Sequence, residues 1–144
     1  MSLLSIASVP ATTVSRETTV LEAARLMSKM RIGAVAVVEQ DRLCGIFSER
    51  DLMTRVVAEA RDPQTIPVGE VMTADTATAY DDMSFGDALR LMVDRHVRHL
   101  PVIDTERRVR GMLSVRNVLQ HRLEDLSNQL DSVVNYFSAD GIGG

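Results

Sequence analysis

The chain has 144 residues, 45% of them hydrophobic, with a formal net charge of −4 and only 3% aromatic residues. This composition supports one folded core and disfavours the basic surface and the aromatic stacking platforms that nucleic-acid binding needs. No apolar run approaches the roughly 18 residues of a membrane span. We therefore expect a globular protein with no nucleic-acid partner and no membrane insertion.

The N-terminal stretch and the cysteine content indicate the compartment. Residues 1–10 lack the charged start and the long apolar core of a signal peptide. Cys44, the one cysteine of the chain, cannot form an internal disulfide and lies in an apolar strand pattern, so it is interpreted as a packed thiol in a reducing environment. The sequence thus predicts a cytoplasmic protein.

Three blocks of the first half recur in the second half in the same order, which predicts a duplicated fold. The matching pairs of blocks are residues 22–27 with 87–92, 32–38 with 97–103, and 45–51 with 111–117. Three ordered matches are improbable by chance. Each half is therefore expected to fold alike, in the order strand, helix, strand, strand, helix.

The first helix of each half has a start signal and an apolar face. Thr19 with Glu22, and Ser84 with Asp87, have the spacing of capping boxes, so the helices are expected to begin there. Apolar side chains then recur on one face at helical spacing. They are Val20, Ala23, Ala24, Met27 and Met30 in the first helix, and Phe85, Ala88, Leu89 and Met92 in the second.

The strands are predicted from short runs rich in β-branched residues. The expected edge strands lie near residues 12–15 and 76–80, the first hairpin strands at 32–38 and 97–103, and the second hairpin strands at 43–47 and 109–113. Polar turns separate the strands of each hairpin, and a second helix starts at Ser48 or Ser114.

These elements predict a mixed α/β (α+β) fold with two pseudo-symmetric β-α-β-β-α repeats. A unit of about 60 residues buries too little surface alone, so the repeats should pack face to face as one module. Repeat 1 is expected over residues 1–60, a connector with Pro63 and Pro67 over 61–70, and repeat 2 over 71–122. Residues 123–144 are expected to form a C-terminal helix extension and a flexible tail.

The passage from strand to second helix carries the pattern Gly-hydrophobic-x-Ser-x-x-Asp. A helix start presents free N–H groups to an anion, and the carboxylate of Asp51 could accept both hydroxyls of a ribose. The same residue pattern, from Ser48 to Asp51 and from Ser114 to Asn117, is also typical of ordinary capping boxes. Residues alone leave both interpretations open.

At this point the chain resembles a CBS-domain pair (cystathionine-β-synthase-type), also called a Bateman module. The resemblance covers residues 12–118, and its motifs are Gly45-Ile-Phe-Ser-Glu-Arg-Asp51, Gly111-Met-Leu-Ser-Val-Arg-Asn117 and Arg98-His-Leu-Pro-Val102. It implies that clefts between the repeats hold AMP, ADP, ATP or another adenosine-containing ligand, with no further cofactor required.

The resemblance also implies roles for single residues. Asp51 would bind the ribose, Ser48 would lie by the phosphate, and the loop 73–78 would close over the adenine. The residues expected at the two clefts are Gly45, Ser48, Arg50, Asp51, Thr73, Ala77, Val97, Arg98, His99, Ser114, Arg116 and Asn117. The second cleft should differ from the first, because the amide of Asn117 is uncharged and has one acceptor oxygen where a carboxylate has two.

Charged and imidazole groups near these motifs have alternative interpretations. Arg50 and Arg116 either reach a phosphate or are solvated arginines at helix starts. His96 and His99 are not expected to bind a metal, because their odd spacing on a strand would place them on opposite faces.

The C-terminal helix has an apolar seam at heptad spacing. Its members are Leu119, Leu123, Leu126, Leu130, Val133 and Phe137. The seam requires a cover, either the same helix of a second subunit or the body of its own module. Family resemblance favours a homodimer.

Taken together, these features predict a non-catalytic regulatory or sensor module that binds an adenine nucleotide and signals to a separate enzyme or transporter. The alternative is a structural or oligomerisation protein with empty clefts that acts through its C-terminal helix. Catalysis is not expected, because the sequence has no nucleophile elbow, no paired cysteines and no Walker-type phosphate loop.

Overall fold

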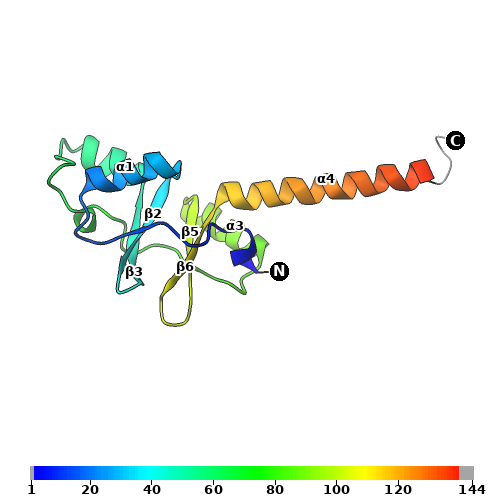
Figure 1. The fold of residues 1–144 in the computed structure, drawn as a ribbon, viewed down its shortest axis with the longest axis horizontal. Coiled ribbons are helices and arrows are strands. Elements are labelled where there is room, and N and C mark those ends of the chain that lie inside the picture. Colours follow the sequence, from blue (N-terminus) through cyan, green and yellow to red (C-terminus); the bar gives the residue numbers. More distant parts are fainter. Residues whose placement is uncertain (1, 140–144) are drawn as a thin grey trace.

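Two three-stranded sheets, one in each half of the chain, form the body of this computed structural model, which describes residues 2–139 (Figure 1). In the first sheet β1 (Thr13–Val14) pairs in parallel with β2 (Ala34–Glu39), and β2 pairs antiparallel with β3 (Arg42–Ser48). The second sheet repeats this order and these directions with β4 (Ala79–Tyr80), β5 (His99–Ile103) and β6 (Val109–Ser114). The predicted mixed α/β fold and its duplication are confirmed.

The first helices, α1 (Val20–Met30) and α3 (Phe85–Arg95), begin where their caps predict. The Thr19 hydroxyl accepts a bond from the Glu22 N–H, and Ser84 does the same for Asp87. In α1 the Glu22 carboxylate then bonds the Thr19 hydroxyl rather than its backbone N–H, so the predicted box is only half formed.

Both helices end in a left-handed residue, which shifts the start of the following strand. Arg31 and His96 have φ near 55° and 54°, and the next N–H groups, of Ile32 and Val97, bond the carbonyls of the last helical turn at 3.0 Å. This closing motif takes Ile32 and Val97 out of the strands in which they were predicted. Met30, predicted for the buried face of α1, lies on this last turn and is 51% exposed.

The second helix of repeat 1 is short and irregular. Ser48 caps α2 (Glu49–Asp51), which continues as a π-helical segment, Leu52–Val57. Such segments are rare and often occur at functional sites. The connector after it is ordered and buries Ile66 and Val68 in the core of the first repeat.

The segment that precedes each edge strand crosses to the opposite repeat. Near the N-terminus, Ser8 pairs with Met112 through two backbone bonds of 2.9 and 3.0 Å, and Leu3 is fully buried in the core of the second repeat. In the same way Thr73 pairs with Ile46 of the first repeat through two bonds of 2.9 Å. A third cluster of buried residues contains side chains of both sheets, such as Ile46 and Met112. The repeats are therefore packed as one module.

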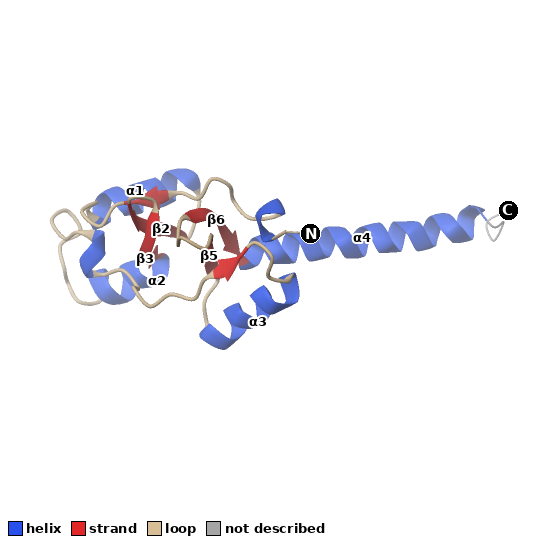
Figure 2. Cartoon of the chain, turned by 90° about the horizontal axis from the view of Figure 1, so that it is seen from below, coloured by secondary structure: helices blue, strands red, loops and turns tan. Residues whose placement is uncertain are grey.

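The last helix, α4 (Val115–Ala139), leaves the module as a long projection (Figures 1 and 2). Its start is anchored by the buried Val118 and by an edge-to-face contact between His121 and Phe85, with ring centroids 4.8 Å apart. Beyond this point the seam is open to solvent, so the module's own body does not cover it. Residues 140–144 of the predicted tail lie outside the described residues. Within residues 2–139, none of the helices combines the length and apolar character that a membrane crossing needs.

Candidate functional site

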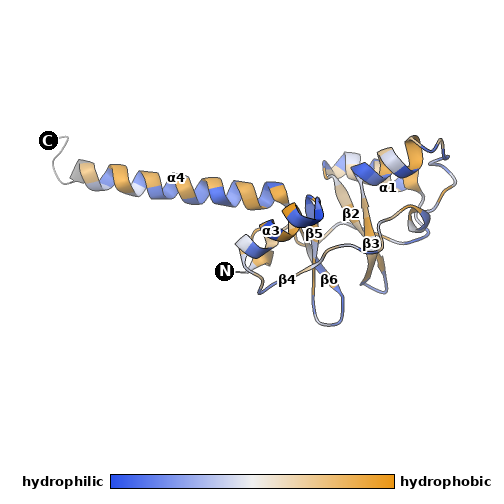
Figure 3. Ribbon diagram, turned by 180° about the vertical axis from the view of Figure 1, so that it is seen from behind, coloured by the Kyte–Doolittle hydropathy of each residue, from blue (hydrophilic) through white to orange (hydrophobic). Residues whose placement is uncertain are grey.

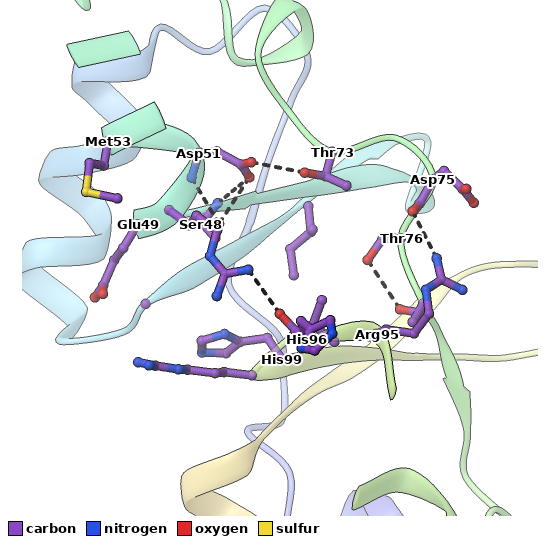
Figure 4. A pocket seen from close by; sticks show the side chains of 16 residues that line it. Ser48, Glu49, Asp51, Met53, Thr73, Asp75, Thr76, Arg95, His96 and His99 are labelled. Carbon is purple, nitrogen blue, oxygen red and sulfur yellow. Dashed lines mark hydrogen bonds between the residues drawn. The ribbon is translucent and has the colours of Figure 1, made fainter. Parts of the chain in front are cut away.

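A cavity of about 430 Å³ lies between the two repeats, next to the start of α2 (Figure 4). Three segments supply most of its wall: residues 48–51 at the strand-to-helix corner, residues 73–77 ahead of β4, and residues 95–99 between α3 and β5. The sheet side of the cavity adds Ile46 and Gly33. Because the segments come from both halves and from the chain between them, the cavity exists only when the repeats are packed together.

The corner at Ser48 is a complete capping box. The Ser48 hydroxyl accepts a bond from the Asp51 N–H at 3.3 Å, and Oδ2 of Asp51 accepts bonds from the Ser48 N–H at 3.0 Å and the Ser48 hydroxyl at 3.1 Å. The capping-box interpretation is therefore confirmed. The same residues line the cavity, and their contact with an anion or a ribose stays a prediction.

Asp51 is the one charged side chain that is buried among the described residues, with 5% of its surface exposed. Its Oδ1 accepts a bond from the Thr73 hydroxyl at 3.0 Å and lies 3.7 Å from Nε of Arg55. A carboxylate has about four acceptor positions, and protein hydrogen bonds fill three of them. One acceptor position on Oδ1 is then without a protein hydrogen bond, and the binding of ribose hydroxyls by Asp51 stays a prediction.

The sequence analysis missed Arg55, which pairs with Asp51 and also contacts the segment that leads to Thr73. Its Nη1 donates to the carbonyls of Met72 at 2.8 Å and Val71 at 3.4 Å. Arg55 thus joins the buried acid to the segment that enters the cavity at Thr73. The spacing of four residues between Asp51 and Arg55 is typical of helical ion pairs and was the available signal.

Arginine side chains from both repeats line the cavity. Nη1 of Arg50 donates to the His96 carbonyl at 3.0 Å. Nη2 of Arg95 donates to the Asp75 carbonyl at 3.5 Å (Figure 4). Arg98 and His99 line the cavity as well. Burial lowers the pKa of His99 below its usual value of 6.5; the charge of Glu49 opposes this shift, and that of Arg98 adds to it.

The family model of the CBS domain matches this chain twice, over residues 5–58 and over residues 68–124. The chain belongs to the CBS domain family. CBS domain-containing protein YhcV of Bacillus subtilis is 37% identical over 115 residues, which are 80% of this chain and 81% of that protein.

Solved CBS structures share the fold of this pair. The CBS-domain containing protein ATU1752 from Agrobacterium tumefaciens is 27% identical with a TM-score of 0.75, over 83% of this chain and 95% of that one. The CBS domain pair of protein MJ0100, solved in complex with 5′-methylthioadenosine and S-adenosyl-L-methionine, is 24% identical with a TM-score of 0.76, over 83% and 98% of the two chains.

Most residues predicted for the first cleft of the CBS pair line this cavity. They are Ser48, Arg50, Asp51, Thr73, Ala77, Val97, Arg98 and His99. Gly45 lies behind the wall, where an added Cβ would come within 2.6 Å of the Thr73 carbonyl oxygen and 2.9 Å of Sδ of Met72. This close approach explains the glycine structurally. Whether any of these residues contacts a ligand stays a prediction.

The remaining predicted residues, Ser114, Arg116 and Asn117, lie at the corresponding corner of the second CBS repeat and are not part of this cavity. There the Ser114 N–H donates to Oδ1 of Asn117, and the Asn117 N–H donates to the Ser114 hydroxyl, both at 3.0 Å. The two corners therefore share a geometry and differ in charge, as their sequences predict.

The prediction that His96 and His99 face opposite ways was wrong, because both line the cavity. Alternation applies only within a strand, and His96 is the left-handed cap of α3, ahead of β5. Other lining residues were missed as well: Gly33, Ile46, Glu49, Met53, Asp75, Thr76, Arg95 and His96. Among residues 2–139, no three His, Cys, Asp or Glu side chains gather in a way that could hold a metal ion.

Proposed function

We propose that this CBS pair is a non-catalytic regulatory module that binds an adenine nucleotide in the cavity between its repeats. One observation carries the proposal: a buried carboxylate with a free acceptor position, Asp51, faces the same cavity as the cationic groups of Arg50 and Arg98. A ligand that suits both needs a hydroxyl donor and an anionic group, as a ribose phosphate has.

The size and the lining of the cavity also suit a nucleotide. Small-molecule sites usually measure about 300–1,000 Å³ and are largely apolar with a few placed polar groups. Ile46, Ala77 and Val97 offer apolar contact to a base. Arginine binds phosphate oxygens through paired N–H donors. We therefore assign the ribose to Asp51, the base to the apolar side chains, and the phosphate to the region of Ser48 and Arg98.

A solved relative supports adenosine as the core of the ligand. The MJ0100 pair holds 5′-methylthioadenosine and S-adenosyl-L-methionine on the same fold. The choice among AMP, ADP and ATP rests on the cations of this cavity and on experiment.

Ligand binding between the repeats would link their relative positions to nucleotide level. Arg50 of the first repeat already bonds the His96 carbonyl of the second, and a phosphate would compete for that guanidinium. A ligand changes such an equilibrium only through its different affinity for the two arrangements. We propose that a separate enzyme or transporter in the cytoplasm responds to this change.

A thermal-shift panel of adenosine, AMP, ADP, ATP and S-adenosylmethionine tests the proposed function. A ligand at 100 times its Kd adds about 2.7 kcal/mol to stability, so a true ligand raises the Tm clearly. Calorimetric titration of Asp51→Ala should then show a loss of at least about tenfold in affinity, while Asn117→Ala, the matched change at the other corner, should lose less. Equal losses, or no binding by any adenosine compound at millimolar concentration, would refute the proposal.

The exposed seam of α4 supports a second candidate function, oligomerisation through the C-terminal helix. Its side chains from Leu119 to Phe137 have no cover in the described chain. Truncation after His121 should then abolish self-association and leave nucleotide affinity intact. Loss of both properties on truncation would contradict a separate role for the helix.

A further inference from the structure

Arg55 is not among the residues that line the cavity, yet it contacts one that does. Its Nε lies 3.7 Å from Oδ1 of Asp51. The other ion pairs among residues 2–139 join exposed side chains, as between Arg61 and Glu70. The pair with Arg55 is therefore the one in the described chain that includes a buried acid, and a buried carboxylate is costly without partners.

The contact between Arg55 and Asp51 supplies charge and leaves an acceptor position open. At 3.7 Å, Nε is too far from Oδ1 to donate a hydrogen bond. The positive charge still attracts the carboxylate and favours one orientation of it. A closer arginine would occupy the acceptor position that a ribose hydroxyl needs. The geometry thus suits an arginine that orients Asp51 for a ligand.

The same guanidinium also holds the segment that carries Thr73. Nη1 of Arg55 donates to the carbonyls of Met72 at 2.8 Å and Val71 at 3.4 Å. The next residue, Thr73, donates the hydrogen bond to Oδ1 of Asp51. Arg55 therefore fixes both partners of that bond, the acid through its charge and the hydroxyl through the adjoining backbone. A lysine has a single ammonium on a flexible stem and cannot make both contacts with one planar group.

The π-helical segment Leu52–Val57 sets the position of Arg55 relative to Asp51. Backbone bonds there reach five residues back, as from the Ala58 N–H to the Met53 carbonyl at 2.9 Å. Such a turn contains more residues than the roughly 3.6 of an α-helix. A residue four positions on therefore lies almost directly above the first, and a regular α-helix would carry Arg55 further around the axis.

The second repeat offers an internal comparison for this arrangement. There Asn117 takes the place of Asp51. The place of Arg55, four residues further on, is taken by His121. This imidazole packs against Phe85, with ring centroids 4.8 Å apart, and α4 continues from the corner as a regular α-helix (Figure 3). The corner with an amide in place of the acid thus has neither the arginine nor the π-helical segment.

We infer that Arg55 is a positioning residue for the ribose of the ligand and that it acts through Asp51 without touching the ligand. The inference rests on the nucleotide function proposed above and deepens it. Removal of Arg55 releases Asp51 and the segment at Thr73 together, so the open acceptor position is no longer held in place. The loss of affinity should fall on the ribose hydroxyls and spare the base and the phosphate.

Calorimetric titration with AMP and with 2′,3′-dideoxy-AMP, which lacks both ribose hydroxyls, tests this role. Arg55→Met should weaken AMP at least about fivefold and the dideoxy compound less than about twofold. Arg55→Lys, the milder change, should lose less AMP affinity and again spare the dideoxy compound. Arg61→Met removes a similarly exposed arginine from its ion pair with Glu70 and should change neither affinity.

Two results of this titration would overturn the inference. A merely structural role of Arg55 would weaken both compounds equally, and a residue without any role would leave AMP binding unchanged. Failure of the proposed function gives a different result, because the wild type itself then binds no adenosine compound.

Thermal melts of the ligand-free protein test the link between Arg55 and Thr73. Both side chains act on the same carboxylate, so their effects should be coupled. The Tm losses of Arg55→Met and Thr73→Val should not add, and the double variant should melt close to the less stable single variant. Additive losses would overturn the inference.

Discussion

The hydroxyl of Thr73 donates a hydrogen bond of 3.0 Å to Oδ1 of Asp51, so the segment ahead of β4 holds the buried acid of the first repeat. This contact joins residues 22 positions apart. The position of Asp51 in the candidate site therefore depends on how the segment at Thr73 packs against the first repeat.

Replacement of Thr73 by valine keeps the volume and removes the donor. A bond to a charged group contributes about 1.5–3 kcal/mol, so Thr73→Val should lower the free energy of unfolding by that amount in urea denaturation. Thr76→Val is the matched control, because the Thr76 hydroxyl bonds only a neighbouring carbonyl, at 3.3 Å. An equal loss in the free energy of unfolding for the two variants would show that the hydrogen bond to Asp51 does not stabilise the fold.

A pair of glycine substitutions tests the close packing behind the cavity. In Gly45→Ala the new Cβ would come within 2.6 Å of the Thr73 carbonyl oxygen, whereas Gly86→Ala meets no atom within 4 Å. We expect Gly45→Ala to lower stability and weaken nucleotide binding, because the segment at Thr73 must shift. Gly86→Ala, in α3, should stabilise by up to about 1 kcal/mol. Thermal melts and calorimetry measure both, and a tolerated Gly45→Ala would contradict the packing described.

Arg50 can be tested with a ligand pair that differs in one phosphate. If its guanidinium binds phosphate, Arg50→Ala should weaken AMP about tenfold or more and leave adenosine nearly unchanged. If Arg50 serves only to join the repeats through the His96 carbonyl, both ligands should lose affinity equally. Isothermal titration of the two ligands against wild type and variant distinguishes these roles.

The lowered pKa of His99 predicts a pH dependence of stability. Burial disfavours the charged imidazole in the folded state, so below 6.5 the unfolded chain binds more protons than the folded chain. Stability should therefore fall as the pH falls from about 6.5 toward the folded pKa. His99→Gln should flatten this slope in urea denaturation between about pH 7 and pH 5, and an unchanged slope would exclude His99 as its source.

Local patterns were enough to predict the duplication, the caps at Thr19 and Ser84, both hairpins and the two strand-to-helix corners. Each of these depends on residues a few positions apart, whose spacing is visible in the sequence. Errors occurred where local conformation changes between elements. Ile32 was placed in a strand and His96 was given a strand-like direction, because the left-handed residues that end α1 and α3 carry side chains rather than glycine and gave no signal.

Contacts between distant residues could be known only from the folded chain. The Thr73 bond to Asp51, the Arg50 bond to the His96 carbonyl and the burial of Leu3 in the opposite repeat join positions 22, 46 and more than 70 residues apart. Such contacts depend on how two repeats pack, and neither repeat specifies them alone. The sequence pattern likewise predicted the apolar seam of α4. Only the structure shows that the seam is exposed, because its exposure depends on the direction in which the helix leaves the module.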